Sequence, residues 1–310
     1  MSAQRTLLDG GRWHWNHGPI DIVAQADGDA ATVQRAHEDA WLRFRGILDE
    51  LVAELPLLRQ PVGAQHALAG PIARRMWEAC AEVRAAAGSP FMTPMAAVAG
   101  SVAQELIACY ARPGIERAWI NNGGDIAMHL AAGTSARVGV FSDLARFDWR
   151  DAGPVVTDGQ FDIAAHVPVR GVATSGWRGR SFSLGIADSV TVLAATAALA
   201  DAAATVVANA VNVDDPAIHR LPANECKDDS DLGDIPVTVD VGALEAAQVH
   251  RALDAGAASA RCLQRAGLVW SVALVCQGQW RVIEPLCSTT ADGAALVRTT
   301  QRTAIGSVFA

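Results

Sequence analysis

The pair Asp201 and Thr205 has the residue types and the spacing of a metal site. The two residues lie four positions apart in an alanine-rich stretch, and positions i and i+4 share one face of an α-helix. A carboxylate and a hydroxyl are hard oxygen ligands, which Mg²⁺ binds beside phosphate oxygens and water. The spacing therefore predicts a magnesium site at Asp201 and Thr205. The alternative is that Asp201 caps a neighbouring element and holds no metal.

A second group is the segment Asn121-Asn122-Gly123-Gly124-Asp125, which follows an expected strand. Gly123 and Gly124 can adopt positive φ and expose backbone N–H groups that suit a phosphate or a ribose. Asp125 could accept a hydrogen bond from a hydroxyl or a ring N–H. The segment is neither a GxGxxG motif nor a P-loop. It predicts a cofactor contact at Gly123, Gly124 and Asp125 and leaves an ordinary hairpin turn as the alternative.

A third group consists of Thr174, Ser175 and Gly176, which end another expected strand and precede an arginine-rich turn. The two hydroxyls could donate to a pyrophosphate, and Arg178 or Arg180 would add positive charge. A plain strand-end turn is the alternative. A serine-hydrolase triad is not favoured, because Ser175 lies outside a G-x-S-x-G elbow. No residue is singled out as catalytic.

The remaining patterns predict the elements that position these groups. The expected helices are 31–55, 71–87, 95–110, 196–211 with Thr196 as N-cap, and 244–266. The expected strands are 21–25, the two flanking Gly123-Gly124, 136–141, 163–169, 189–192, 237–241, 268–275 and 280–283, with loops at 143–160 and 212–234. Small residues at 96–100 would allow another segment to approach that helix closely. The mixed order of helices and strands along the chain favours an α+β fold, with mixed or antiparallel sheets and packed helices.

Charge limits the classes of partner. The net charge of −8 argues against nucleic-acid binding, which needs clustered Lys and Arg. The main basic cluster, Arg170, Arg178 and Arg180, is small enough to serve one anionic ligand. The apolar run 190–211 contains Asp201 and Asn209, which favours a strand and a helix over a membrane span. We expect a phosphorylated small molecule as partner and neither nucleic acid nor membrane.

Chain length and cysteine usage indicate the domain organisation and the cellular location. With 310 residues, 51% of them hydrophobic, the chain can bury one large core, and we expect a single domain over residues 1–286. Residues 287–310 are expected to form a C-terminal tail that is flexible or an oligomer arm, so a homo-oligomer is possible. The six cysteines show no zinc spacing, and the first residues show no signal peptide. We therefore expect a cytoplasmic protein with reduced thiols.

Taken in order, the motifs form a more specific pattern than any one of them does. The chain carries Gly123-Gly124-Asp125, then Ala173-Thr174-Ser175-Gly176, then Ser189-Val190-Thr191-Val192, then Ala200-Asp201 with Ala204-Thr205. This order resembles the ApbE-like superfamily, whose best-known members are FAD:protein FMN transferases. The resemblance is clear over residues 89–212. It extends to the whole chain for one cytoplasmic branch of the superfamily that has no assigned activity.

The resemblance implies an ApbE-like α+β fold, with FAD bound beside Mg²⁺ and FMN transferred to a Thr or Ser of a protein acceptor. Asp201 and Thr205 would match the metal ligands, completed by a backbone carbonyl near residues 97–99. Gly123, Gly124 and Asp125 would match part of the flavin pocket. Thr174, Ser175 and Gly176 would line its phosphate side.

The chain also departs from the transferases. Their His-x-x-Asp-Pro-x-Thr-Gly stretch is replaced by residues 180–188, their early His-x-Met-Gly-Thr by residues 17–21, and a common Asp by Gln104. Three interpretations therefore stay open. The protein could be a Mg²⁺-dependent transferase or hydrolase acting on a flavin or another phosphorylated cofactor. It could instead be a non-catalytic flavin- or nucleotide-binding accessory protein, or an enzyme of another cofactor-biosynthesis pathway with a reshaped pocket.

Overall fold

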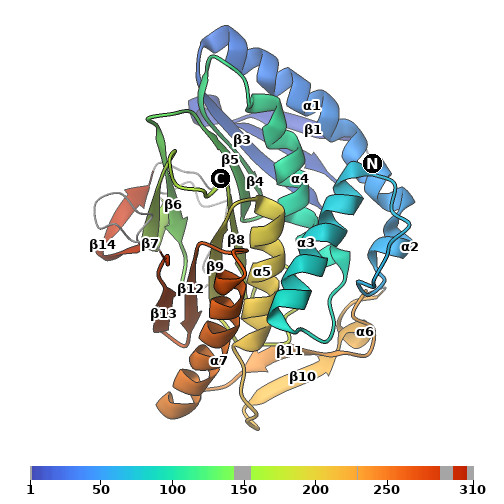
Figure 1. Ribbon diagram of the computed structural model, residues 1–310, viewed down its shortest axis with the longest axis vertical. Coiled ribbons are helices and arrows are strands. Elements are labelled where there is room, and N and C mark those ends of the chain that lie inside the picture. Colours follow the sequence, from blue (N-terminus) through green and yellow to red (C-terminus); the bar gives the residue numbers. More distant parts are fainter. Residues whose placement is uncertain (1, 143–154, 229, 287–295, 306–310) are drawn as a thin grey trace.

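A nine-stranded antiparallel sheet forms the centre of the molecule (Figure 1). The computed structural model describes residues 2–142, 155–228, 230–286 and 296–305, with 155–157 and 296–305 described by their backbone only. The strand order is β1-β2-β3-β4-β5-β8-β9-β12-β13. The strands are β1 (Gln4–Leu7), β2 (Trp13–His17), β3 (Ile20–Gly28), β4 (Ile115–Asn122), β5 (Asp125–Leu130), β8 (Gly171–Ser175), β9 (Ser189–Ala194), β12 (Ser271–Cys276) and β13 (Gln279–Ile283). The expected α+β class is confirmed.

The longer helices cover one face of this sheet (Figure 1). They are α1 (Ala30–Ala53), α3 (Pro71–Ala87), α4 (Val98–Ile107), α5 (Ala197–Ala210) and α7 (Ala246–Arg265), with a short α2 (Leu55–Leu58) after α1. Helix α5 lies in the middle of the layer and contacts α3, α4 and α7. Its buried positions are all Ala or Val, and such small side chains let the neighbouring helices approach closely. The Thr196 hydroxyl accepts a hydrogen bond from the Leu199 N–H at 3.3 Å, which confirms the expected N-cap.

The other face of the sheet packs against a small antiparallel sheet of β6 (Ser135–Val140), β7 (Val155–Ala164) and β14 (Leu296–Ile305). Strand alternation decides which side chains face which layer. In β5, Ile126 and Met128 join the cluster with β6 and β7, whereas Ala127 joins the core beneath the helices. Ala127, the small residue between them, therefore faces the helices.

Two expectations about the elements are wrong. Residues 143–160 were expected to form a loop and 163–169 a strand, but β7 begins at Val155 and ends at Ala164. The part of the expected loop over 143–154 lies outside the described residues. Pairing with β6 from Ser135 to Val140 fixes that register. The expected loop 212–234 contains β10 (Ile218–Pro222) and the short helix α6 (Ala223–Cys226), and β10 pairs with β11 (Pro236–Val241). Backbone pairing overrides polar composition in both places.

The C-terminal region is described only in part. Residues 296–305 form β14 and pair with β7. The expectation of a flexible tail or an oligomer arm otherwise falls on residues outside the described ranges. Across the described residues, we find no helix with the length and apolar character needed to cross a bilayer.

Candidate functional site

Asp201 joins two helices of the core. Its carboxylate oxygen Oδ2 accepts the backbone N–H of Gly100, in the first turn of α4, at 2.8 Å. The N–H of Ala99 also stabilises this carboxylate. The first N–H groups of a helix have no partner within the helix, and a carboxylate there is favoured by the helix dipole. Asp201 therefore does cap a neighbouring helix, as the structural alternative held, and the cap fixes where the carboxylate lies.

Gly100 makes this contact possible. A Cβ atom at this position would lie 2.2 Å from the carbonyl oxygen of Ala197 and 2.8 Å from the Cβ of Asp201. Only a residue without a side chain allows α4 and α5 to approach this closely. The small residues of the 96–100 segment indicated such an approach, and the structure identifies α5 as the element that makes it.

The Asn121–Asp125 segment forms a tight hairpin turn between β4 and β5. Gly123 and Gly124 have φ values of 65° and 117°, in the region that favours glycine. The Asn121 side chain accepts the N–H of Gly124 at 2.8 Å and shapes the turn. Buried Asn122 donates its amide N–H to the carbonyl of Ala99 at 3.1 Å, which ties the turn to the first turn of α4.

Asp125 lies near enough to Asp201 to act on its charge, although the two residues lie far apart in the sequence. Both carboxylates are enclosed by protein, although each residue keeps some accessible surface. Burial raises the pKa of Asp125 to about 7, against the opposing effects of the Thr174 N–H and of Arg180. Burial and the nearby Asp125 raise the pKa of Asp201 well above its ordinary value. The negative charge of Asp125 thus disfavours the charged form of Asp201, and a bound cation would relieve this.

The third group lies beside Asp125. The Thr174 N–H donates to Asp125 Oδ1 at 3.2 Å, and its hydroxyl lies 3.1 Å from that of Thr191 on β9. Ser175 is half-buried at the end of β8. Gly176 has a packing role, because a Cβ there would lie 2.5 Å from the carbonyl oxygen of Asp188. The structure therefore brings Thr174 to Asp125, and Gly176 allows the close approach of Asp188.

The expected basic cluster separates into three environments. Arg170 donates to the carbonyls of Ala165, Val167 and Val169, so its guanidinium stabilises the turn before β8. Arg178 lies over the ring of Trp177, with its Cζ 4.6 Å from the ring centroid. Arg180 alone reaches the Gly123-Gly124 turn: its Nη1 would lie 2.7 Å from a Cβ added to Gly123.

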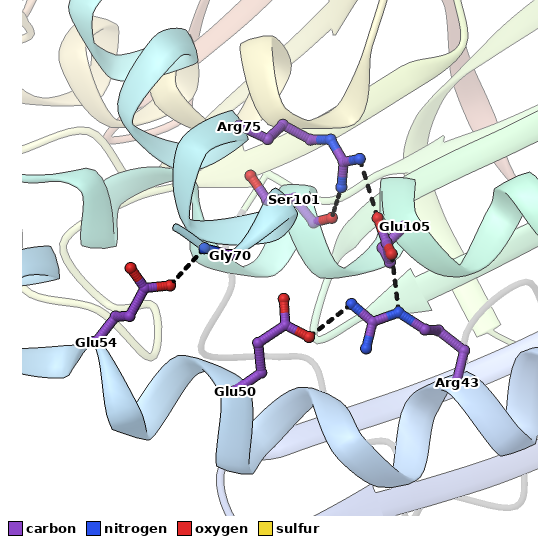
Figure 2. Close-up of polar contacts among 7 residues, drawn as sticks. All are labelled: Arg43, Glu50, Glu54, Gly70, Arg75, Ser101 and Glu105. Atoms are coloured by element: carbon purple, nitrogen blue, oxygen red, sulfur yellow. Dashed lines mark hydrogen bonds and ion pairs between the residues drawn. The ribbon is translucent and has the colours of Figure 1, made fainter. Parts of the chain in front are cut away.

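An ion-pair network supports α4 from outside the site. Figure 2 shows Arg75 of α3 donating to the carbonyl of Ser101 at 3.1 Å and to Glu105 at 3.0 Å. Arg43 of α1 donates to the other oxygen of Glu105 and to Glu50, each at 2.8 Å. Because Ser101 follows Gly100, the network fixes the turn of α4 that meets Asp201.

The donor set fits a magnesium ion. Mg²⁺ in proteins is commonly held by one or two carboxylates, with water and substrate phosphate completing the shell. Asp201 and Asp125 supply two carboxylates, and Thr205 supplies a hydroxyl one turn along α5. No Lys or Arg among the described residues forms an ion pair with either carboxylate. Among the same residues, no three His, Cys, Asp or Glu side chains come together in an arrangement that could hold a metal ion.

Sequence patterns did not reveal the role of Asn122, nor the pairing of Asp125 with Asp201. Asn122 was part of the Asn-Asn-Gly-Gly-Asp segment, but nothing local indicated that its amide would reach α4. The pairing depends on the contact between the β4–β5 turn and α4. A double asparagine before two glycines was the available signal, and it is equally typical of a hairpin turn.

The fold and the site define an α+β protein with an enclosed carboxylate pair at the start of a helix. A family model described as "AbpE bacteria" matches residues 4–282. The chain belongs to this family, within the ApbE-like superfamily, which confirms the resemblance of its motifs.

Similar proteins include "UPF0280" proteins of methanogenic archaea. The one from Methanosphaerula palustris is 33% identical over 196 residues, which cover 59% of this chain and 74% of that protein. The one from Methanopyrus kandleri is 39% identical over 151 residues, covering 48% and 56%. The match thus spans little more than half of the second relative.

Two solved structures are also similar. The apo flavinyl transferase ApbE of Pseudomonas stutzeri matches with a TM-score of 0.47 and 11% identity, covering 91% of this chain and 95% of that one. The ApbE protein of Thermotoga maritima matches with a TM-score of 0.41 and 13% identity, covering 68% and 87%.

Proposed function

We propose that this protein is a Mg²⁺-dependent transferase that acts on a flavin nucleotide, with FAD as the donor. The observation that carries the proposal is the enclosed pair Asp125–Asp201 beside the Gly123-Gly124 turn. An enclosed pair of carboxylates that forms no ion pair with Lys or Arg among the described residues is costly unless it serves a ligand. Membership of the ApbE-like superfamily, which includes FAD:protein FMN transferases, supports flavin as that ligand.

The residues of the site have distinct roles in this proposal. Asp201 and Thr205 would hold the metal, which supplies positive charge to a pyrophosphate when bound. The Asn122 amide and the Gly100 N–H hold the first turn of α4 against Asp201. The Gly123-Gly124 turn, Thr174 and Ser175 would contact the nucleotide. The expected cytoplasmic location and the single domain over residues 1–286 belong to the same proposal.

The proposed FMN transfer is a displacement at phosphorus. The hydroxyl oxygen of a Thr or Ser on a protein acceptor forms a bond to the FMN phosphorus. The P–O bond of the pyrophosphate breaks, and AMP leaves with the electron pair. The hydroxyl proton passes to solvent.

A second candidate function is flavin or nucleotide binding without turnover. The transferases' His-x-x-Asp-Pro-x-Thr-Gly stretch is replaced here by residues that anchor a loop: Ser183 and Leu184 both donate to the Asn209 side chain. A loop held in this way can keep a ligand site without supplying a reacting group.

Isothermal titration of the metal-stripped protein with FAD, with and without Mg²⁺, tests the proposal. We expect saturable binding that needs Mg²⁺ and is lost in Asp201→Asn. Asp49→Asn, which changes an exposed carboxylate on α1, is the matched control and should bind as the wild type does. Unchanged binding in Asp201→Asn would refute the metal site. Release of AMP with a supplied acceptor distinguishes a transferase from a binding protein.

A further inference from the structure

The loop between β8 and β9, residues 176–188, is held firmly at several points. The Trp177 N–H donates to the carbonyl of Ala187 at 3.0 Å, and the Trp177 indole donates to Asp188 at 3.3 Å. The middle of the loop is tied to α5 through Asn209, and the Ser183 carbonyl accepts the N–H of Thr238 at 2.8 Å. The loop is thus a fixed support for the side chains at its tip.

The side chain of Arg180, at the tip of this loop, contacts two other turns. Its Nη2 donates to the carbonyl of Pro19, in the β2–β3 turn, at 3.1 Å. Its Nη1 rests against the bare Cα of Gly123, where a Cβ would be only 2.7 Å away. The planar guanidinium is therefore held in one place by a carbonyl and by a glycine backbone, above the turn that carries Asp125.

The surroundings of Arg180 differ from those of a structural arginine. The residue is exposed, and no carboxylate in the described part of the chain lies at ion-pair distance from it. The Asp21 carboxylate is hydrogen-bonded to His14 at 2.7 Å, and the positive charge of Arg180 acts on it only from a longer distance. A guanidinium has five N–H donors. Among the described residues, only the Pro19 carbonyl accepts a hydrogen bond from those of Arg180. The remaining donors are available to a ligand.

We propose that Arg180 binds a phosphate group of the ligand across the Gly123-Gly124 turn and so selects phosphorylated over unphosphorylated flavin. This inference rests on the proposed function. A guanidinium fork matches two phosphate oxygens and forms charge-assisted hydrogen bonds. Its position beside Asp125 sets a fixed positive charge opposite the carboxylates that would hold the metal. The ligand phosphate would then lie between two positive centres. Gly123 leaves room for the guanidinium, since a Cβ there would lie 2.7 Å from Nη1.

The test compares FMN with riboflavin, because the two differ only in a phosphate monoester. Isothermal titration in Mg²⁺ would use the wild type, Arg180→Gln, Arg180→Lys and the matched control Arg178→Gln. We expect Arg180→Gln to weaken FMN binding about tenfold or more, as loss of a charged hydrogen bond does, and to leave riboflavin binding within about twofold. Arg180→Lys should be intermediate, since an ammonium keeps the charge without the fork. Arg178→Gln should change neither affinity.

Two results would overturn the inference. Equal weakening of FMN and riboflavin in Arg180→Gln would mean that Arg180 only supports the loop. Unchanged FMN binding in that variant would mean that no phosphate lies there. If the wild type binds neither flavin, the flavin part of the proposed function fails, and the same variants are titrated with Mg²⁺ and inorganic pyrophosphate. Binding that depends on Arg180 would then support the phosphate subsite alone, and absent or Arg180-independent binding would refute it.

Discussion

Substituting Gly100 by alanine tests the contact on which the whole site depends. Gly100 lies within α4, so alanine would ordinarily stabilise the helix by about 1 kcal/mol. Here the added Cβ would be 2.2 Å from the Ala197 carbonyl oxygen, 2.7 Å from its carbon and 2.8 Å from the Cβ of Asp201. None of these atoms can rotate away, because they belong to the backbone or to a Cβ. The two helices must separate by about 1 Å to restore ordinary contact distances.

The magnitude follows from two opposing terms. Overpacking of a tight core costs about 1–3 kcal/mol, and the immobile contacts place Gly100→Ala near the upper end. Subtracting the helix gain of about 1 kcal/mol leaves a net loss of about 2 kcal/mol in the free energy of unfolding. The separation also lengthens the 2.8 Å hydrogen bond from Gly100 to Asp201. We therefore expect stabilisation by Mg²⁺ and FAD to disappear as well.

Urea denaturation of the wild type and of two variants measures this effect. The matched control is Gly46→Ala on α1, where an added Cβ meets nothing within 4 Å. That variant should be more stable than the wild type by about 0.5–1 kcal/mol. If Gly100→Ala is as stable as the wild type, or gains as much as Gly46→Ala, the close approach of α4 and α5 and the site built on it are wrong.

Three further predictions concern charge. Burial lowers the pKa of His37 to about 4, so the unfolded chain takes up this proton first and stability falls as the pH drops from about 7 toward 4. Relative to His37→Gln, the wild type should lose about 2 kcal/mol between pH 7.5 and pH 5 in urea melts; parallel pH profiles would contradict this. Asp201→Asn should raise the melting temperature of the metal-free protein, because it removes an enclosed carboxylate whose pKa is raised, while abolishing the shift on adding Mg²⁺; a lower melting temperature would mean that the cap depends on the charge. A double-mutant cycle on Arg75 and Glu105 should give a coupling of about 1 kcal/mol, against about 0–0.5 kcal/mol for the more exposed pair Arg281–Asp254; equal couplings would exclude a special role of the network in holding α4.

The sequence predicted elements best where local signals agreed. Helix α3 was expected over 71–87 and spans Pro71–Ala87, because proline begins it and Gly88, at a φ of 65°, ends it. The β4–β5 hairpin was indicated by its two glycines. The predictions failed where long-range pairing decides the structure: β7 is set by β6, and β10 by β11.

The sequence by itself determined the chemical inventory of this protein: a carboxylate and a hydroxyl one helical turn apart, a Gly-Gly turn before Asp125, and a family-specific order of motifs. These are properties of neighbouring residues, and helix and turn geometry fix them locally. Only the tertiary structure decided that Asp125 lies near Asp201, that Asn122 donates to α4 and that Arg180 lies against Gly123. The physical reason is that these contacts depend on how the layers pack. The close approach of α4 to α5 at Gly100 and the hydrogen bond from Asn122 to Ala99 set distances that sequence spacing does not encode.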